Sequence, residues 1–324
     1  MAVSTEGDTQ VDMLSLLTTA VIAFIPGLLI HSFIIVTNVT DWWKGRSVTS
    51  VDHIVTFLGI SRMGMQCTDI FYMIDFELLV RSSNSELIVN IINVVYFFFN
   101  YTNIWLTTLL SIVFCLKISN LRTRLFLYLR RVIVHRTGHF IVASGLLAAF
   151  NSLMLFFMSM IEMTSDDGSH NTTMDDDLTV CFTISSILNF TLGSLLPQFF
   201  YLISSILLFV SLYHHTVKMK MSSNSSINLE TYYSAMKLVF FTFIYNSIYL
   251  IGHFASSFIF YFYCISLDWL YIVLDFLPVL HSSFLIYRTV RLRSQMSKVL
   301  QNVIDFIFQR KDTETRENIE VIAH

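Results

Sequence analysis

Ionisable side chains inside long apolar stretches are the first residues of this sequence with a capacity for chemistry. Arg62 and Asp69 are seven residues apart, so a helix places them on one face, two turns from each other. Asp75 and Glu77 follow near the end of the same stretch, and Asp275 lies in a later one. Charges in apolar surroundings are costly and usually face a protein interior. Two interpretations stay open: Arg62 and Asp69 hold helices together, or the carboxylates bind a cation or relay protons.

Two further groups of polar and aromatic residues follow helical spacing. Tyr96, Asn100 and Asn103 are separated by offsets of four and three, so they share one helix face. A buried amide must find a hydrogen-bond partner, and it either joins two helices or orients a ligand among aromatic rings. A second stripe repeats every four residues and is too polar to face lipid: Tyr245, Tyr249 and His253. We predict that it lies inside the protein.

Patterns typical of enzymes, metal sites and cofactor sites are missing from the sequence. The four cysteines match no zinc spacing. Cys181 and Cys264 both fall near helix ends on the same, outer side of the predicted bundle. A disulfide between them is left as an open alternative. There is no Walker A loop, dinucleotide-binding glycine turn, His-Glu-x-x-His or Gly-x-Ser-x-Gly. We therefore predict no enzymatic activity, no metal and no cofactor.

The elements that carry these residues are predicted to be transmembrane helices. Hydrophobic residues make up 54% of the 324 residues and charged residues 13%, against about 25% charged in a globular domain. A helix that crosses the hydrocarbon layer needs about 20 apolar residues. Seven stretches qualify, and the continuous apolar runs favour helices over a β-barrel: 14–37, 54–79, 88–116, 139–161, 184–213, 238–262 and 269–287. We predict an all-α membrane protein, a bundle of seven transmembrane helices spanning 14–287.

The basic residues predict the orientation of this bundle. The chain has 20 Lys and Arg, and 18 of them fall in the tail or in loops on one side of the predicted bundle. The two exceptions are Arg62 and Arg81. By the positive-inside rule that side is cytoplasmic. Residues 1–13 contain no Lys or Arg and are predicted to be an extracellular N-terminus rather than a cleaved signal. The sequon at Asn171 lies in an acidic loop on the outer side and is the predicted glycosylation site.

The residues after the last predicted helix form a separate segment. Residues 288–324 are predicted to be a cytoplasmic tail that begins with Arg288, Arg291 and Arg293. An apolar stretch around Val299 to Phe308 follows. This pattern is typical of a basic amphipathic helix along the inner leaflet of the lipid bilayer.

Short segments at the cytoplasmic ends of the predicted helices resemble those of bitter taste receptors, a family of G-protein-coupled receptors. The most specific segment is Trp105 to Ile112 followed by Leu116 to Asn120. The other segments are Phe33 to Asn38 with Asp41-Trp42, Ser50 to Asp52 with Leu58 to Arg62, Leu207 to Leu212 with His215, Ala235 to Lys237, and His281-Ser282 with Arg291 to Arg293. The chain departs from the family pattern at His31, Tyr232 and Thr289-Val290, so it resembles a divergent member.

The resemblance implies roles for particular residues. It implies an agonist site for small, mostly apolar compounds in the outer half of the bundle, formed by Tyr96, Asn100, Tyr249 and Tyr271. It implies a surface for a heterotrimeric G protein of the gustducin type, formed by Lys117, His215, Lys237 and Arg291. It implies structural or switch positions at Arg62, Ser111, Leu116, Ser211, Leu212, His281 and Ser282. Positive-inside topology is an alternative explanation of the basic residues.

The resemblance therefore favours a chemosensory receptor of the plasma membrane, with no nucleic acid among its partners. A vomeronasal-type chemoreceptor shares the general plan and stays an alternative. A small ion transporter or channel that uses Asp69 and Asp275 is a further alternative. Internal repeats, which many transporters contain, are not visible in the sequence.

Overall fold

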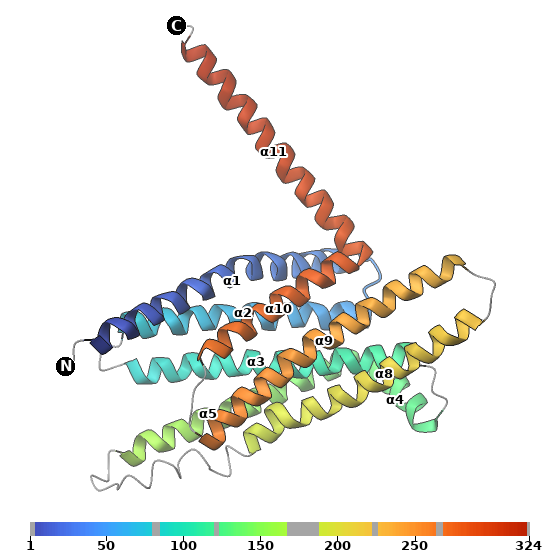
Figure 1. The fold of residues 1–324 in the computed structure, drawn as a ribbon, viewed down its shortest axis with the longest axis horizontal. Helices are drawn as coiled ribbons and strands as arrows, with labels where there is room; N and C mark the ends of the chain where they lie inside the picture. The colour runs from blue at the N-terminus through green and yellow to red at the C-terminus, as the bar shows by residue number, and fades with distance from the viewer. Residues whose placement is uncertain are drawn as a thin grey trace.

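A computed structural model describes residues 4–79, 85–119, 123–166, 188–221, 226–263 and 268–322. In these ranges the chain is helical apart from short connections, and the long helices run side by side (Figure 1). The helices are α1 (Ser4–Trp43), α2 (Ser50–Leu79), α3 (Ser85–Ile118), α4 (Arg124–His135), α5 (Thr137–Asp166), the π-helix η1 (Thr191–Leu195), α8 (Leu196–Met221), α9 (Ser226–Tyr263), α10 (Asp268–Arg288) and α11 (Val290–Ile322).

The predicted transmembrane segments correspond to the long helices of the bundle. Each predicted segment falls on one of α1, α2, α3, α5, α9 and α10, or on η1 with α8. Within the described residues, four stretches have both the length and the apolar composition to cross a membrane: Thr18–Trp43, Ile88–Ile118, Thr137–Met158 and Leu188–His214. The remaining long helices pack against these in the same bundle. The predicted fold class, an all-α membrane bundle, is confirmed.

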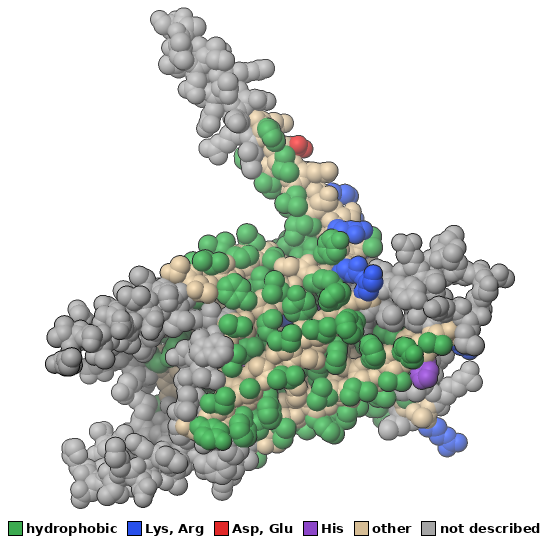
Figure 2. Space-filling model, viewed as in Figure 1, with side chains coloured by type: hydrophobic (Ala, Val, Ile, Leu, Met, Phe, Trp, Pro, Cys, Tyr) green, Lys and Arg blue, Asp and Glu red, His purple; other side chains and the backbone are tan. Residues whose placement is uncertain are grey.

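Helix α3 occupies the centre of the bundle. It packs against α2, α5 and α8, while α1 packs against α2 and α10, and α9 packs against α8 and α10. The central place of α3 explains why polar residues in its middle turns are buried, because α2, α5 and α8 all pack against it. Apolar side chains cover much of the bundle surface in the view of Figure 2, and the blue Lys and Arg side chains gather near α11 and the neighbouring helix ends. We call this end of the bundle the α11 end.

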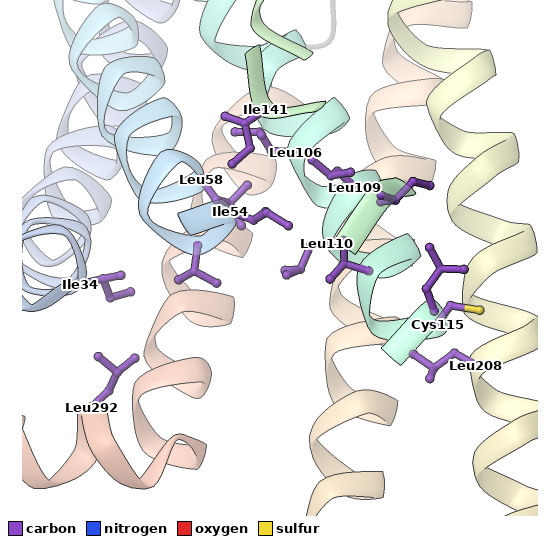
Figure 3. Close-up of a cluster of buried hydrophobic side chains, with 14 of the residues drawn as sticks. Ile34, Ile54, Leu58, Leu106, Leu109, Leu110, Cys115, Ile141, Leu208 and Leu292 are labelled. Carbon is purple, nitrogen blue, oxygen red and sulfur yellow. The ribbon is translucent and has the colours of Figure 1, made fainter. Parts of the chain in front are cut away.

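Aliphatic side chains fill the interior toward the α11 end. The cluster includes Leu58 from α2, Leu110 from α3, Leu208 from α8 and Leu292 from α11, each at most 4% exposed. Leu292 lies near Ile34 of α1 (Figure 3). This contact anchors the beginning of α11 on the bundle. Leu116 and Leu212, two predicted structural positions, belong to the same cluster. Close packing of this kind stabilises helices in lipid through dispersion.

Two small helices were not predicted from the sequence. Helix α4 lies between α3 and α5, and its Phe126 and Ile133 pack into the aliphatic cluster. Its outer face carries Arg130 and Arg131, which are exposed. The π-helix η1 ends two residues before Pro197 and widens one turn of the helix that continues as α8. Pro278 lies inside α10, and Pro26 lies inside α1.

Helix α11 leaves the bundle at an angle and projects away from it (Figure 1). The predicted basic and apolar segment is therefore helical over the described residues 290–322. Its apolar side chains Val299, Leu300, Val303 and Ile304 are each about half exposed, at 46–53%. The membrane-surface role of this helix stays a prediction.

Candidate functional site

Arg62 is the centre of a buried polar network between α2, α3 and α10. It is 3% exposed. Its Nε donates to Asn103 Oδ1 at 3.1 Å, and its Nη1 lies 2.9 Å from Ser282 Oγ and 3.0 Å from His281 Nδ1. A longer contact of 3.5 Å joins Nη1 to the Pro278 carbonyl oxygen. One side chain thus links three helices.

His31 extends this network to α1. Its Nε2 lies 3.1 Å from Ser282 Oγ, and the imidazole has no solvent exposure. The sequence marked His31 only as a departure from the family pattern. The structure gives it a place in the network, where its ring reaches the serine that Arg62 also contacts. His281 and Ser282, predicted as structural positions, are both 2% exposed.

Tyr249 of α9 joins the same network through the other end of the Asn103 amide. Its hydroxyl accepts a hydrogen bond from Asn103 Nδ2 at 2.7 Å and donates one to Asn100 Oδ1 at 3.2 Å. Asn100 and Asn103 therefore lie on one face of α3, as their spacing predicted, and both amides form a hydrogen bond with the same tyrosine. An uninterrupted hydrogen-bond chain now runs from Asn100 through Tyr249, Asn103 and Arg62 to α10.

Aromatic rings surround the Tyr249 end of this chain. Tyr249 makes an edge contact with His253, with ring centroids 4.6 Å apart, and both residues are 4% exposed. Phe97 stacks on Tyr101 of the same helix at 5.9 Å. The prediction that Tyr249 and His253 face the interior is confirmed. Tyr96 is half-buried and lies beside Phe97.

A second polar contact joins α3 to α8 closer to the α11 end. Ser111 Oγ lies 2.8 Å from Ser204 Oγ and 2.9 Å from Ser205 Oγ. One turn before it, Thr108 donates to the carbonyl oxygen of Pro197 at 3.2 Å. Ser111 was predicted as a structural position, and these bonds hold it at the junction of two helices. Ser211, another predicted position, is half-buried on α8.

An ion cluster closes the α11 end of the bundle. Arg291, at the beginning of α11, lies 3.5 Å from carboxylate oxygens of Asp41 and of Asp52 and donates a hydrogen bond to Asn38. Arg46 makes a shorter pair with Asp41 at 2.9 Å. The cluster was not predicted, because its members lie on α1, α2, α11 and the connection between α1 and α2, and carry no local signature. It fastens α11 to the first two helices.

The predicted G-protein-facing residues have different surroundings. Lys117 is half-buried in the last turn of α3, and Lys237 is exposed on α9. Arg291 is 33% exposed and engaged in the ion cluster. His215 lies on α8, and its side chain is outside the described part of the structure. Among Lys117, Lys237 and Arg291, whose side chains the structure describes, no hydrogen bond or ion pair joins one to another.

Several predicted residues fall outside what the structure describes. Asn171, Cys181 and Cys264 belong to segments outside the described residues. Tyr271 and Asp275 lie on α10, and Asp75 and Glu77 on α2, but their side chains are not described. Asp69 is half-buried on α2 and takes no part in the hydrogen bonds of Arg62. Arg62 therefore holds helices together as predicted, through its contacts with α3 and α10.

The chemistry of this interior is that of helix coupling. Its hydrogen bonds connect helices in pairs and triplets, and among the described residues no three His, Cys, Asp or Glu side chains gather as metal ligands do. Apolar helices of membrane length pack around a polar network that reaches α1, α2, α3, α9 and α10. The fold and the site define a multi-pass membrane protein built as a helical bundle.

Comparison with known sequences gives the family. The profile of the family described as taste receptor protein (TAS2R) matches residues 9–304. The chain is 28% identical to taste receptor type 2 member 13 of Pan troglodytes over 89% of this chain and 97% of that protein. It is 31% identical to taste receptor type 2 member 42 of Papio hamadryas over 71% of this chain and 74% of that protein. The chain belongs to the taste receptor type 2 family.

Membership decides between the alternatives that the sequence left open. The protein is a bitter-taste chemosensory receptor of the G-protein-coupled class, and it is not an enzyme. The vomeronasal-type and transporter alternatives are set aside by the match over most of the chain. The family implies small-molecule ligands and coupling to a G protein.

Proposed function

We propose that a small, mostly apolar agonist binds in the half of the bundle away from the α11 end, against Tyr96, Asn100, Tyr249 and Tyr271. The observation that carries the proposal is the position of the Tyr249 hydroxyl, which bonds to both Asn100 and Asn103. Aromatic rings beside it supply apolar contact area, and the amides supply orientation. An agonist with a hydrogen-bonding group competes for this hydroxyl or for the Asn100 amide.

The same hydroxyl gives the agonist a route to the rest of the bundle. Asn103 bonds to Tyr249 through its nitrogen and to Arg62 through its oxygen, so the two contacts depend on one side-chain orientation. A ligand that rotates Tyr249 changes the partners of Asn103 and then of Arg62. Such a ligand shifts the population of active receptor only to the extent that it binds the active state more tightly.

The orientation and the G-protein surface complete the proposal. The distribution of Lys and Arg supports an outer N-terminus and a cytoplasmic α11 end. A gustducin-type heterotrimer then binds at the α11 end. The residues that we propose face it are Lys117, His215, Lys237 and Arg291. Arg291 contributes by holding α11 against Asp41 and Asp52 as well as through its charge.

The test is a calcium response in cells that contain a promiscuous G-protein α subunit, over a panel of bitter compounds. Tyr249→Phe removes only the hydroxyl, and Asn100→Ala removes the amide that it bonds to. We expect either change to weaken the agonist's potency about tenfold or more at equal surface expression, as the loss of about 1–3 kcal/mol from a polar contact requires. Tyr287→Phe is the matched control, because Tyr287 is 63% exposed on α10.

The outcomes separate the parts of the proposal. If Tyr249→Phe and Asn100→Ala respond like Tyr287→Phe, the agonist binds elsewhere. Lys237→Gln tests the other end: we expect it to reduce the maximal response without changing agonist affinity in a binding assay. A change in agonist affinity with an intact maximal response contradicts the proposed role of Lys237.

A further inference from the structure

Helix α4 turns a basic face away from the bundle. Phe126 in its first turn and Ile133 in its last turn are both buried in the aliphatic cluster, so the helix lies against the bundle along its length. The Ser50 hydroxyl of α2 also donates a hydrogen bond to the Val134 carbonyl oxygen at 3.2 Å. Four exposed side chains follow one another on the opposite face at helical spacing: Arg124, Tyr128, Arg131 and His135. Packing therefore fixes these side chains outside the bundle.

The sequence around α4 is basic and contains no acid. Residues 87–161 include six Lys and Arg but no Asp or Glu. Four of the arginines are exposed in α4 or directly after it: Arg124, Arg130, Arg131 and Arg136. Positive-inside topology accounts for the side of the membrane on which these charges lie. It does not account for their concentration on one short helix whose outer face is fixed by packing.

Large apolar side chains accompany the arginines on the exposed side of α4. Tyr128 is 65% exposed and Leu127 is 52% exposed. Tyrosine is enriched where membranes meet water, because its ring is apolar and its hydroxyl is polar. A helix that combines Lys or Arg with exposed apolar side chains is typical of the headgroup region of a bilayer. The exposed side of α4 therefore has the chemistry of a membrane-surface helix.

The neighbouring helix α5 places α4 at the depth of the lipid headgroups. The apolar span of α5 begins at Thr137, two residues after α4 ends at His135, and continues for 22 residues to Met158. At about 1.5 Å per residue this span is roughly 33 Å long, close to the ~30 Å of the hydrocarbon layer. One stripe of exposed apolar side chains follows it: Val142, Leu146, Phe150, Leu153 and Phe157. The basic segment thus begins where this lipid-facing stripe ends.

We propose that the outer face of α4 binds the phosphate-bearing headgroups of acidic phospholipids, and phosphoinositides most tightly. A guanidinium matches the oxygens of a phosphate with two parallel hydrogen bonds, and Lys or Arg clusters on amphipathic helices attract acidic lipids. Leu127 and Tyr128 then contact the apolar region beneath the headgroups. An acidic protein partner would meet the same charge, but the position of α4 beside the lipid-facing stripe of α5 favours lipid. The inference rests on the proposed cytoplasmic position of the α11 end, because acidic lipids are enriched in the cytoplasmic leaflet.

The test is native mass spectrometry of the purified full-length receptor in detergent, titrated with phosphatidylinositol bisphosphate, phosphatidylserine or phosphatidylcholine. We expect half-maximal retention of the bisphosphate lipid at a concentration about tenfold or more below that of phosphatidylcholine, with phosphatidylserine between the two. More ammonium acetate should weaken the retention of both acidic lipids, because salt screens exposed charges. The measurement needs no agonist, no G protein and no known orientation, so its failure is distinct from a failure of the proposed function. Equal retention of the three lipids overturns the inference.

Variants locate the lipid. Arg124→Gln combined with Arg131→Gln removes two charges from the outer face and should weaken retention of the bisphosphate lipid about tenfold or more. Lys44→Gln combined with Lys218→Gln is the matched control, because it removes the same charge from exposed positions elsewhere on the basic side. Arg124→Lys combined with Arg131→Lys keeps the charge and should be intermediate, because an ammonium group lacks the paired hydrogen bonds of a guanidinium.

The outcomes separate lipid from protein as the partner of α4. An equal loss of retention in the lysine control assigns the effect to total charge and overturns the inference. Unchanged lipid retention in the Arg124→Gln, Arg131→Gln variant also overturns it. If that variant keeps its lipid but loses the calcium response at equal surface expression, the face binds the G protein instead. All four substituted side chains are exposed, so the variants are expected to fold.

Discussion

The amide of Asn103 on α3 donates a 2.7 Å hydrogen bond to the hydroxyl of Tyr249 on α9. Its oxygen accepts from Nε of Arg62 on α2. A single amide therefore fixes the relative positions of three helices, and it has no freedom to flip without losing both bonds. This constraint makes Asn103 a more sensitive reporter of the bundle's conformation than Asn100, which has the same side chain one turn away.

The Asn103–Tyr249 bond is expected to be energetically coupled to the Arg62 contact. Asn103→Ala leaves a buried hydroxyl and a buried guanidinium with one partner fewer each, so it should reduce the free energy of unfolding by about 1–3 kcal/mol. In a double-mutant cycle with Tyr249→Phe, we expect an interaction energy of about 0.5–3 kcal/mol. Thermal midpoints of the four purified proteins measure it. Strict additivity of the two changes contradicts the direct bond.

Close contact between α2 and α3 depends on Gly64. A Cβ at this position would lie 2.6 Å from the ring of Phe99. Gly64→Ala is therefore expected to destabilise the bundle by about 1–3 kcal/mol through overpacking. Gly145→Ala on α5 is the control, because no atom lies within 4 Å of a Cβ there. Midpoints of thermal unfolding compare the two, and recovery in a Gly64→Ala, Phe99→Leu double variant identifies the ring as the obstacle.

The attachment of α11 depends on Arg291. Asp41 has a side chain that is only 4% exposed, and removing Arg291 leaves this buried carboxylate with the pair to Arg46 alone among the described residues. Arg291→Gln should lower the free energy of unfolding by about 1–3 kcal/mol. Arg293→Gln, two residues further along the same helix and exposed, should change it by less than about 0.5 kcal/mol. Raising the ionic strength with sodium gluconate is expected to narrow the difference, because salt screens partly exposed pairs.

Glycosylation at Asn171 tests the proposed orientation. If the loop that contains Asn171 faces the outside, the protein from cells carries a glycan, and Asn171→Gln should migrate on a gel like enzymatically deglycosylated wild type. An epitope at the N-terminus should be accessible to antibody in intact cells. Antibody binding only after permeabilisation contradicts an outer N-terminus.

The helices and the inward direction of polar stripes were predictable, because both follow from local composition and spacing. Long apolar runs identify α3 and α8, and the four-residue repeat of Tyr249 and His253 predicts an interior stripe. Burial of Arg62 also follows from the cost of a charge in lipid. These predictions need no knowledge of which helices are neighbours.

The partners of these residues were not predictable for the opposite reason. Arg62 and Ser282 are 220 residues apart in sequence, and Asn38 and Arg291 are 253 apart. The family resemblance marks Ser282 as a structural position, but nothing in the sequence around it names Arg62 as its partner. The prediction that Arg62 helps hold helices together came from its spacing along one helix, and that spacing could not name its partners on α3 and α10. Helix α4 was missed because its basic residues were interpreted only as a sign of topology.

The π-helix at Thr191–Leu195 has a consequence for how such receptors diversify. A π-turn accommodates one more residue than an α-turn, so losing a single codon there would rotate the preceding residues by about 100° around the helix axis. Phe190, which now packs against Phe254 and Phe258 of α9, would then face a different helix. We expect one-residue insertions and deletions in this turn among related genes to alter the range of detected compounds more than many point changes do.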